Sequence, residues 1–260
     1  MNNMPAITGW NWLKQGTGLF RKQPAALTTL LFANILFSLL IGSVPLLGTL
    51  LAIVLIPSFS MAFMQACLMI ENGERVTPVV LMTGFRKPVL AQLCKIGLIY
   101  LVVSVLLTLL ARFSVDLEQI RQVVQPADPK QQVPAVAGWE FVKMFALSAL
   151  NASVLIALSF AAPLLYWQGM KPGKAIFYSF FAVLKSARVF LVLLLSWFGM
   201  LLAFTVVIQL VMGASMFGKV LVMWLLFLFV LLLQCAMYAG YRQIFGKPVQ
   251  APASRVNLEK

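Results

Sequence analysis

The chain has 260 residues, of which 62% are hydrophobic and only 10% are charged. Soluble globular domains carry about 45–50% apolar and about 25% charged residues, so this composition excludes a soluble enzyme, a disordered chain and a secreted disulfide scaffold. The charged residues comprise 20 Lys and Arg against 7 Asp and Glu, and there is no histidine, which excludes catalysis or metal binding through imidazole. We therefore predict a polytopic α-helical membrane protein.

Six apolar stretches are long enough to cross a bilayer, because a spanning helix needs about 20 predominantly apolar residues. They cover residues 24–43, 46–70, 90–112, 143–167, 189–212 and 218–239. An even number of spans leaves both termini on the same side of the membrane. The sequence thus predicts an all-α transmembrane bundle of six spans, forming a single integral membrane domain over residues 1–260.

Basic residues are distributed unevenly between the loops. Fifteen of the Lys and Arg residues fall on the side that holds the two termini, and five fall on the opposite side. Cytoplasmic loops of membrane proteins carry such an excess, so both termini are predicted to be cytoplasmic. The opposite side carries four of the seven acids, Asp116, Glu118, Asp128 and Glu140, which agrees with this orientation.

The chain contains a weak internal repeat that divides it into three hairpins. Residues 18–24 have the sequence GLFRKQP, residues 84–88 have GFRKP, and a looser copy, SFFAVLKSAR, occupies residues 179–188. Pro5, Pro78 or Pro172 precedes each copy, and proline suits the first turn of a helix. We predict three repeated hairpins, each opened by a short interfacial helix. The alternative is chance similarity in leucine-rich sequence.

The short helices carry the residues that we expect to contact lipid headgroups. Basic side chains can face lipid phosphates while aromatic rings lie at headgroup level. The predicted interfacial residues are Arg21, Lys22, Arg86, Lys87, Lys185, Arg188, Trp10 and Trp12. Because the basic residues form short clusters along one membrane edge, anionic lipid is the expected partner rather than nucleic acid. The sequence predicts no cofactor and leaves protein partners unknown.

Polar residues and prolines within the apolar stretches are the other candidates. Their amides either bond to neighbouring helices or line a path for a substrate. The candidate lining residues are Asn34, Gln65, Asn151, Gln168 and Gln234. Pro57 and Pro163 are expected to kink the second and fourth spans, either as shape-setting bends or as hinges that expose carbonyl groups.

Small residues at four-residue spacing predict how the spans pack. The fourth span carries such a stripe at Ala149, Ser153, Ala157 and Ala161, and shorter stripes occur on the second and fifth spans. We expect these three spans to pack closely in the centre. The leucine- and phenylalanine-rich sixth span is expected to face lipid.

Two regions of the chain resemble an uncharacterised proteobacterial family of six-span inner-membrane proteins. The N-terminus has the sequence GWNW at residues 9–12 and FRKQP at residues 20–24. The second region has FAAPL at residues 160–164, then Gly169, Ala175 and SFFAVLK at residues 179–185. From the distribution of basic residues, the arm over residues 1–23 and the tail over 241–260 are predicted to be cytoplasmic, and the loop over 113–142 periplasmic. The resemblance implies a bacterial inner-membrane location. It implies no particular activity.

Three functions are compatible with these features. A non-enzymatic scaffold or lipid-organising helper is favoured by the basic, aromatic segments and by the lack of catalytic or ion-coupling groups. The alternative is a transporter or flippase of a lipid or small amphiphile, which requires a polar cavity. A membrane enzyme is the third, and Glu71, Glu74 and the acids of the outer loop are the carboxylates that could serve it. We expect that the protein is not an enzyme.

Overall fold

A computed structural model describes residues 4–45, 47–87, 89–116, 137–213 and 215–248. These residues form helices and short connections, with no strand among them. In chain order the elements are α1 (Thr8–Lys22), α2 (Pro24–Gly42), α3 (Leu47–Glu71), the 3₁₀ helix η1 (Pro78–Phe85), α4 (Val89–Ser114), α6 (Ala137–Leu158), α7 (Ala161–Gln168), α8 (Pro172–Lys185), α9 (Ala187–Met212) and α10 (Met216–Phe245).

The six predicted spans are confirmed. Within the described ranges, six helical segments are long and apolar enough to cross a membrane. They are Pro24–Gly42, Leu47–Glu71, Val89–Ser114, Gly138–Gln168, Ala187–Met212 and Met216–Phe245. The sixth span continues past residue 241, where the predicted tail begins. Most of the predicted periplasmic loop, residues 117–136, lies outside the described residues.

Each of the three hairpins is preceded by a short helix, as the repeat predicts. Helix α1 precedes the α2–α3 hairpin, η1 precedes the hairpin of α4 with α6 and α7, and α8 precedes the α9–α10 hairpin. Prolines occupy the first turns of η1 and α8, where a missing N–H costs no hydrogen bond. The hairpin is therefore the repeating structural unit of this fold.

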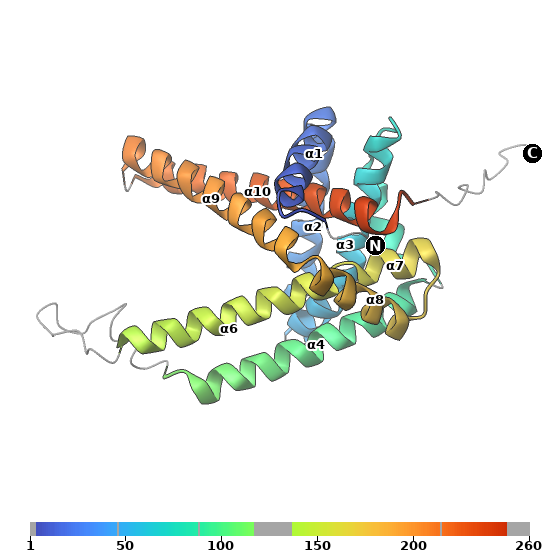
Figure 1. Cartoon of the computed structure of the whole chain (residues 1–260), viewed down its shortest axis with the longest axis horizontal. Helices are drawn as coiled ribbons and strands as arrows, with labels where there is room; N and C mark the ends of the chain where they lie inside the picture. The colour runs from blue at the N-terminus through green and yellow to red at the C-terminus, as the bar shows by residue number, and fades with distance from the viewer. Residues whose placement is uncertain (1–3, 46, 88, 117–136, 214, 249–260) are drawn as a thin grey trace, which may run out of the picture.

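The spans meet at one end of the molecule, which we call the basic end because Arg21, Lys22, Arg86 and Lys87 lie there. In Figure 1 the α4–α6 pair and the α9–α10 pair extend away from the region of α7 and α8 and diverge. Hydrogen bonds join the span ends at the basic end: the Gln23 amide binds the Glu74 carbonyl at 2.7 Å and the Val76 N–H at 3.1 Å. Far from it, the Lys143 ammonium donates to the Ser114 carbonyl at 2.7 Å.

The core lies at the basic end, between the last turns of α3 and α10 and the helices α1 and α7. Residues 61–70 of α3 and 235–241 of α10 are mostly buried. The sulfur atoms of Cys67 and Cys235, both fully buried, lie 3.6 Å apart. Buried side chains here are covered by protein, and exposed side chains on a span face lipid or a groove between helices. Packing at this end fixes how the six spans are joined.

Helix α1 lies across α9 and α10 at the basic end and is part of the core. Its buried residues follow a helical spacing and include Gly9, Trp12 and Gly16. A Cβ atom on Gly9 would lie 2.2 Å from the Val189 carbonyl oxygen, and one on Gly16 would lie 2.6 Å from the Ala236 nitrogen. These glycines allow backbones to approach closely, as small residues do in membrane helix pairs.

The predicted packing of the spans is wrong in two respects. Ala149 and Ser153 of the fourth-span stripe are exposed, and only Ala161 is buried. Only 6% of the most apolar stretch of α9 is buried within the protein, so this span is not central. In contrast, α10 contacts α1, α2, α3 and α9. The sixth span is therefore central over its last turns and not lipid-facing throughout, because its small residues Ala236, Ala239 and Gly240 admit α1 and α3.

The fourth span is broken between α6 and α7 at Ser159 and Phe160. The break leaves backbone groups without helical partners, which is costly in a membrane. Ser179 of α8 satisfies two of them: its hydroxyl donates to the Ala157 carbonyl at 2.6 Å and accepts from the Phe160 N–H at 3.1 Å. Ser179 is fully buried, so α8 is fixed to the break.

Candidate functional site

A charged network that the sequence did not predict joins α1, α3 and α10 at the basic end. The Glu71 carboxylate accepts hydrogen bonds from the Tyr238 hydroxyl and the Arg242 guanidinium. The Glu71 side chain is 15% exposed and that of Arg242 is 38% exposed. Arg242 also donates to the Gln15 side chain at 2.9 Å. The signal in the sequence is an acid at the end of an apolar span, on the side rich in basic residues.

Replacing this carboxylate with an amide is expected to loosen the basic end. In Glu71→Gln the charge that partners Arg242 is lost while the volume is kept. Because Arg242 is partly exposed and solvent screens its charge, we expect a loss of about 1–2 kcal/mol in the free energy of unfolding. A double-mutant cycle with Arg242→Gln, followed by unfolding in detergent, measures the coupling. Additive effects of the two substitutions would contradict a direct interaction.

Most of the predicted interfacial residues are exposed at the basic end. They are Arg21 and Lys22 at the end of α1, Arg86 and Lys87 after η1, and Lys185 and Arg188 around the α8–α9 junction. Trp10 is partly buried, and the Lys14 ammonium lies 5.6 Å from its ring centre. These side chains are placed where they can meet a charged surface.

The prediction that Trp12 contacts lipid headgroups is wrong. Trp12 is completely buried, and its ring packs edge-on against Phe190 at 5.3 Å between centroids. Its indole N–H donates to the Gln243 side chain at 2.6 Å. Because α1 turns its tryptophan-bearing face toward α9 and α10, the ring belongs to the core.

Helix α8 exposes an apolar face beside basic residues. The exposed large apolar and aromatic residues on this helix are Phe177, Tyr178, Phe180, Phe181 and Leu184. The Lys174 ammonium lies 5.7 Å from the centre of the Tyr178 ring. A cavity of about 430 Å³ lies between α8 and Phe245 of α10, with Lys185 among the residues that line it. Such a combination of exposed apolar and basic side chains is typical of amphipathic helices in the membrane interface.

The five candidate lining residues do not surround one cavity. Asn34 and Gln234 line a groove between α2, α3 and α10. Asn151 lines a different groove between α4 and α6, together with polar side chains of α4. Gln65 accepts a hydrogen bond from the Trp167 indole at 3.0 Å, and Gln168 donates to the Tyr241 hydroxyl at 3.3 Å. Gln65 and Gln168 therefore connect helices at the basic end.

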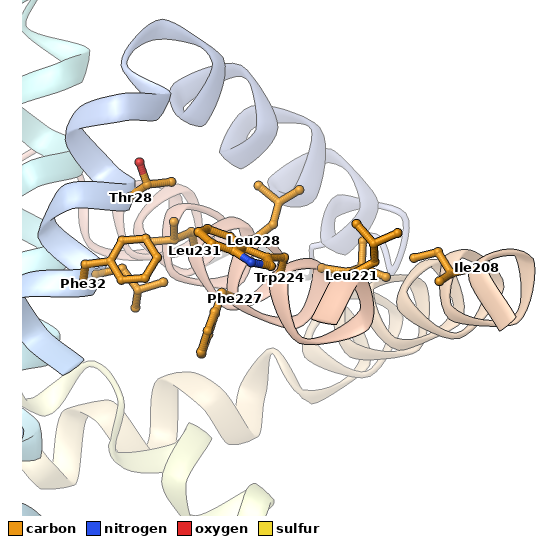
Figure 2. Close-up of a pocket in the computed structure, with 10 residues that line it drawn as sticks. Thr28, Phe32, Ile208, Leu221, Trp224, Phe227, Leu228 and Leu231 are labelled. Atoms are coloured by element: carbon orange, nitrogen blue, oxygen red, sulfur yellow. The ribbon is translucent and has the colours of Figure 1, made fainter. Parts of the chain in front are cut away.

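An apolar groove lies on another side of the contact between α2 and α10. Figure 2 shows its residues extending from Thr28 and Phe32 of α2 along Leu231, Leu228 and Trp224 of α10. Its volume is about 390 Å³, and Ile208 of α9 also lines it. Apart from the Thr28 hydroxyl and the Trp224 indole N–H, its lining is hydrocarbon and aromatic, which suits an acyl chain.

The two prolines differ in their surroundings. Pro57 is buried within α3, which continues through it to Glu71. Pro163 lies in the first turn of α7, just after the break at Ser159 and Phe160. A proline in a first turn needs no N–H partner, so it helps to define where α7 begins.

The two segments of the FAAP and SFFA resemblance meet in the structure. Phe160 of the first segment and Ser179 of the second share the hydrogen bond that closes the break. Gly169, which lies between them, ends α7 with a φ of 60°, and Ala175 is completely buried. In this chain the motif forms the junction of α7 and α8, so its residues have structural roles.

Comparison with known proteins finds a relative along almost the whole chain. The chain is 32% identical over 257 residues to a probable inner membrane protein of Burkholderia thailandensis. The match covers 96% of this chain and 94% of the relative. No protein-family model matches the chain, and no solved structure matches it either.

Proposed function

The chain belongs to the family of this probable inner membrane protein, and from that premise we propose that it is a non-enzymatic protein that binds and organises anionic lipids at one face of the inner membrane. The six apolar helices and the inner-membrane relative show a multi-pass inner-membrane protein. The lipid function is our inference. The observation that carries it is the exposed aromatic face of α8 beside Lys174, Lys185 and Arg188.

The chemistry of α8 matches an anionic lipid better than a soluble partner. Its aromatic rings can enter the headgroup region, while the neighbouring ammonium and guanidinium groups bind phosphate. Each basic residue near an anionic surface contributes about 1 kcal/mol. Ser179 ties this helix to the broken fourth span, so a lipid bound at α8 rests on a fixed support.

The other basic segments extend the same surface. Arg21 and Lys22 follow α1, and Arg86 and Lys87 follow η1, all of them exposed at the basic end. The Glu71 carboxylate, the acid nearest to Arg242, is occupied by Tyr238 and Arg242. With the excess of basic residues facing the cytoplasm, as the positive-inside rule requires, both termini would be cytoplasmic.

A second candidate function, transport of a lipid or small amphiphile, is supported by the groove that Asn34 and Gln234 share. Gln65 and Gln168 are engaged elsewhere, and Asn151 lines a separate groove. The polar residues therefore form separate sites rather than one path, which favours lipid organisation as the first proposal.

The lipid proposal is tested with a pair of charge-neutralised variants. Lys185→Gln with Arg188→Gln removes two basic residues at α8, and Arg112→Gln with Lys219→Gln removes two exposed ones at the opposite ends of the spans. Each protein is placed in nanodiscs of phosphatidylglycerol and phosphatidylcholine, and bound lipids are identified by native mass spectrometry. Two contacts of about 1 kcal/mol each predict that the α8 variant loses about tenfold or more of its preference for the anionic lipid.

The Arg112 and Lys219 variant is expected to retain the preference of the unmodified protein. An unchanged preference in the α8 variant, or an equal loss in both variants, would contradict a specific site at α8. Thermal melting in detergent checks that both proteins are folded.

A further inference from the structure

The groove between α2, α3 and α10 is lined by polar side chains from all three helices. It has a volume of about 380 Å³. Its polar residues are Asn34 and Ser38 of α2, Thr49 and Ser60 of α3, and Gln234 of α10. Asn34 lies near the middle of the 19-residue helix α2, well away from either membrane surface. Such residues are rare within apolar spans and are often functional.

Asn34 has an unpaired hydrogen-bond acceptor in this groove. Its Oδ1 atom is buried and has no hydrogen-bond partner among the residues that the structure describes. A buried acceptor without a donor costs about 1–3 kcal/mol, and no bulk water is present at this depth. Oδ1 is covered by protein while the Asn34 side chain lines the groove, so the amide has to rotate about χ2 to present this acceptor to a molecule in the groove. A molecule that then donates a hydrogen bond to Oδ1 recovers this energy.

The lining restricts the head of that molecule to an uncharged group. Among the described residues, none that lines the groove is charged, so a phosphate or carboxylate would lie unpaired in a low-dielectric site. Amides and hydroxyls both donate and accept hydrogen bonds, which matches a hydroxyl-bearing head. Phe59, Phe63 and Leu231 provide apolar walls for the rest of the molecule.

We propose that this groove binds an uncharged amphiphile whose hydroxyl head donates a hydrogen bond to Asn34. The head lies between Asn34 and Gln234, and the apolar tail leaves along the helices into the bilayer. This site differs in depth and in charge from the phosphate-binding surface at α8. It therefore stands or falls separately from the lipid-organising function.

The experiment uses photocrosslinking to the full-length protein in phosphatidylcholine nanodiscs. Two probes carry a diazirine in the tail, one with a glyceride head and one with a quinol head, because both sources supply uncharged hydroxyls. A third probe of equal length carries a carboxylate. Labelled peptides are identified by mass spectrometry, and we expect labelling of α2 and α10 by one or both hydroxyl probes and not by the carboxylate. The probe that labels the protein shows whether the bound head is a glyceride or a quinol.

Two substitutions act on the site in different ways. Asn34→Leu removes the acceptor, and Ala52→Phe fills the groove from α3 without changing the amide. Loss of a hydrogen bond of about 1 kcal/mol predicts about fivefold weaker labelling in Asn34→Leu, and the filled groove should label still less. Asn151→Leu removes the same group from the separate groove between α4 and α6 and should label normally.

Unchanged labelling in both Asn34→Leu and Ala52→Phe would overturn the proposal, and so would an equal loss in Asn151→Leu. Stronger labelling by the carboxylate probe would also overturn it. Melting temperatures in detergent show whether each variant is folded. If either Asn34→Leu or Ala52→Phe does not fold, labelling of the other variant decides whether the proposal holds.

Discussion

Gly97→Ala is expected to destabilise the protein by about 3 kcal/mol, near the upper end of the usual cost of overpacking. Gly97 lies on the buried face of α4, where a Cβ atom would come 1.9 Å from the Val54 carbonyl oxygen of α3. The obstructing atoms belong to the backbone and cannot rotate away. The helices must therefore separate, which weakens the contact between the first and second hairpins.

The matched control is Gly199→Ala in the middle of α9. A Cβ atom there meets nothing within 4 Å, and the residue is exposed. Because alanine favours a helix over glycine, this variant should be unchanged or slightly more stable. The measurement is unfolding in mixed detergent micelles followed by tryptophan fluorescence. Equal stabilities of the two variants would show that α3 and α4 are not in backbone contact.

Ser179→Ala should destabilise the junction of α6, α7 and α8 by about 2 kcal/mol or more. The substitution leaves the Phe160 N–H and the Ala157 carbonyl without the partner that the Ser179 hydroxyl provides. Each buried unpaired group costs about 1–3 kcal/mol, although bonds between membrane helices often contribute less. Hydrogen exchange at residues 157–162 should rise before the protein unfolds as a whole.

Ser153→Ala on α6 provides the comparison. Its hydroxyl donates to the Ala149 carbonyl of its own helix at 2.8 Å and is exposed, so its loss leaves no backbone group without a partner. We expect stability within about 0.5 kcal/mol of the unmodified protein. An effect as large as that of Ser179→Ala would mean that neither hydroxyl has a special role.

The spans and the repeat could be predicted because their signals are local. Length and apolarity are properties of a continuous stretch of residues, so the bounds of α2, α3 and α9 agree with prediction within two residues. Pro78 and Pro172 each favour a helix start because proline lacks the backbone N–H, which has no partner in a first turn. The break before α7 also has a local cause, which is Pro163. However, the residue that stabilises the break, Ser179, lies 19 residues beyond Phe160.

Packing between distant segments could not be predicted in the same way. The small-residue stripe at Ala149 and Ser153 has the spacing of a helix contact, yet it is exposed. Small residues permit close approach but do not select the partner, and several spans carry similar stripes. Tryptophan is a residue type common at membrane interfaces, but contacts of the Trp12 ring with Phe190 and Gly240, both distant in sequence, place it in the core. The Glu71 network requires α1, α3 and α10 together.

The burial of α1 against the last span has a consequence for biosynthesis. Trp12 and its partner Gln243 are 231 residues apart, so the ribosome makes one long before the other. At about 5–20 residues per second, the interval is about 12–46 s. During this time α1 lacks α9 and α10, the two helices that it contacts most extensively, and the membrane interface can receive its apolar face. Trp12 can therefore take its place in the core only after the final hairpin has been inserted.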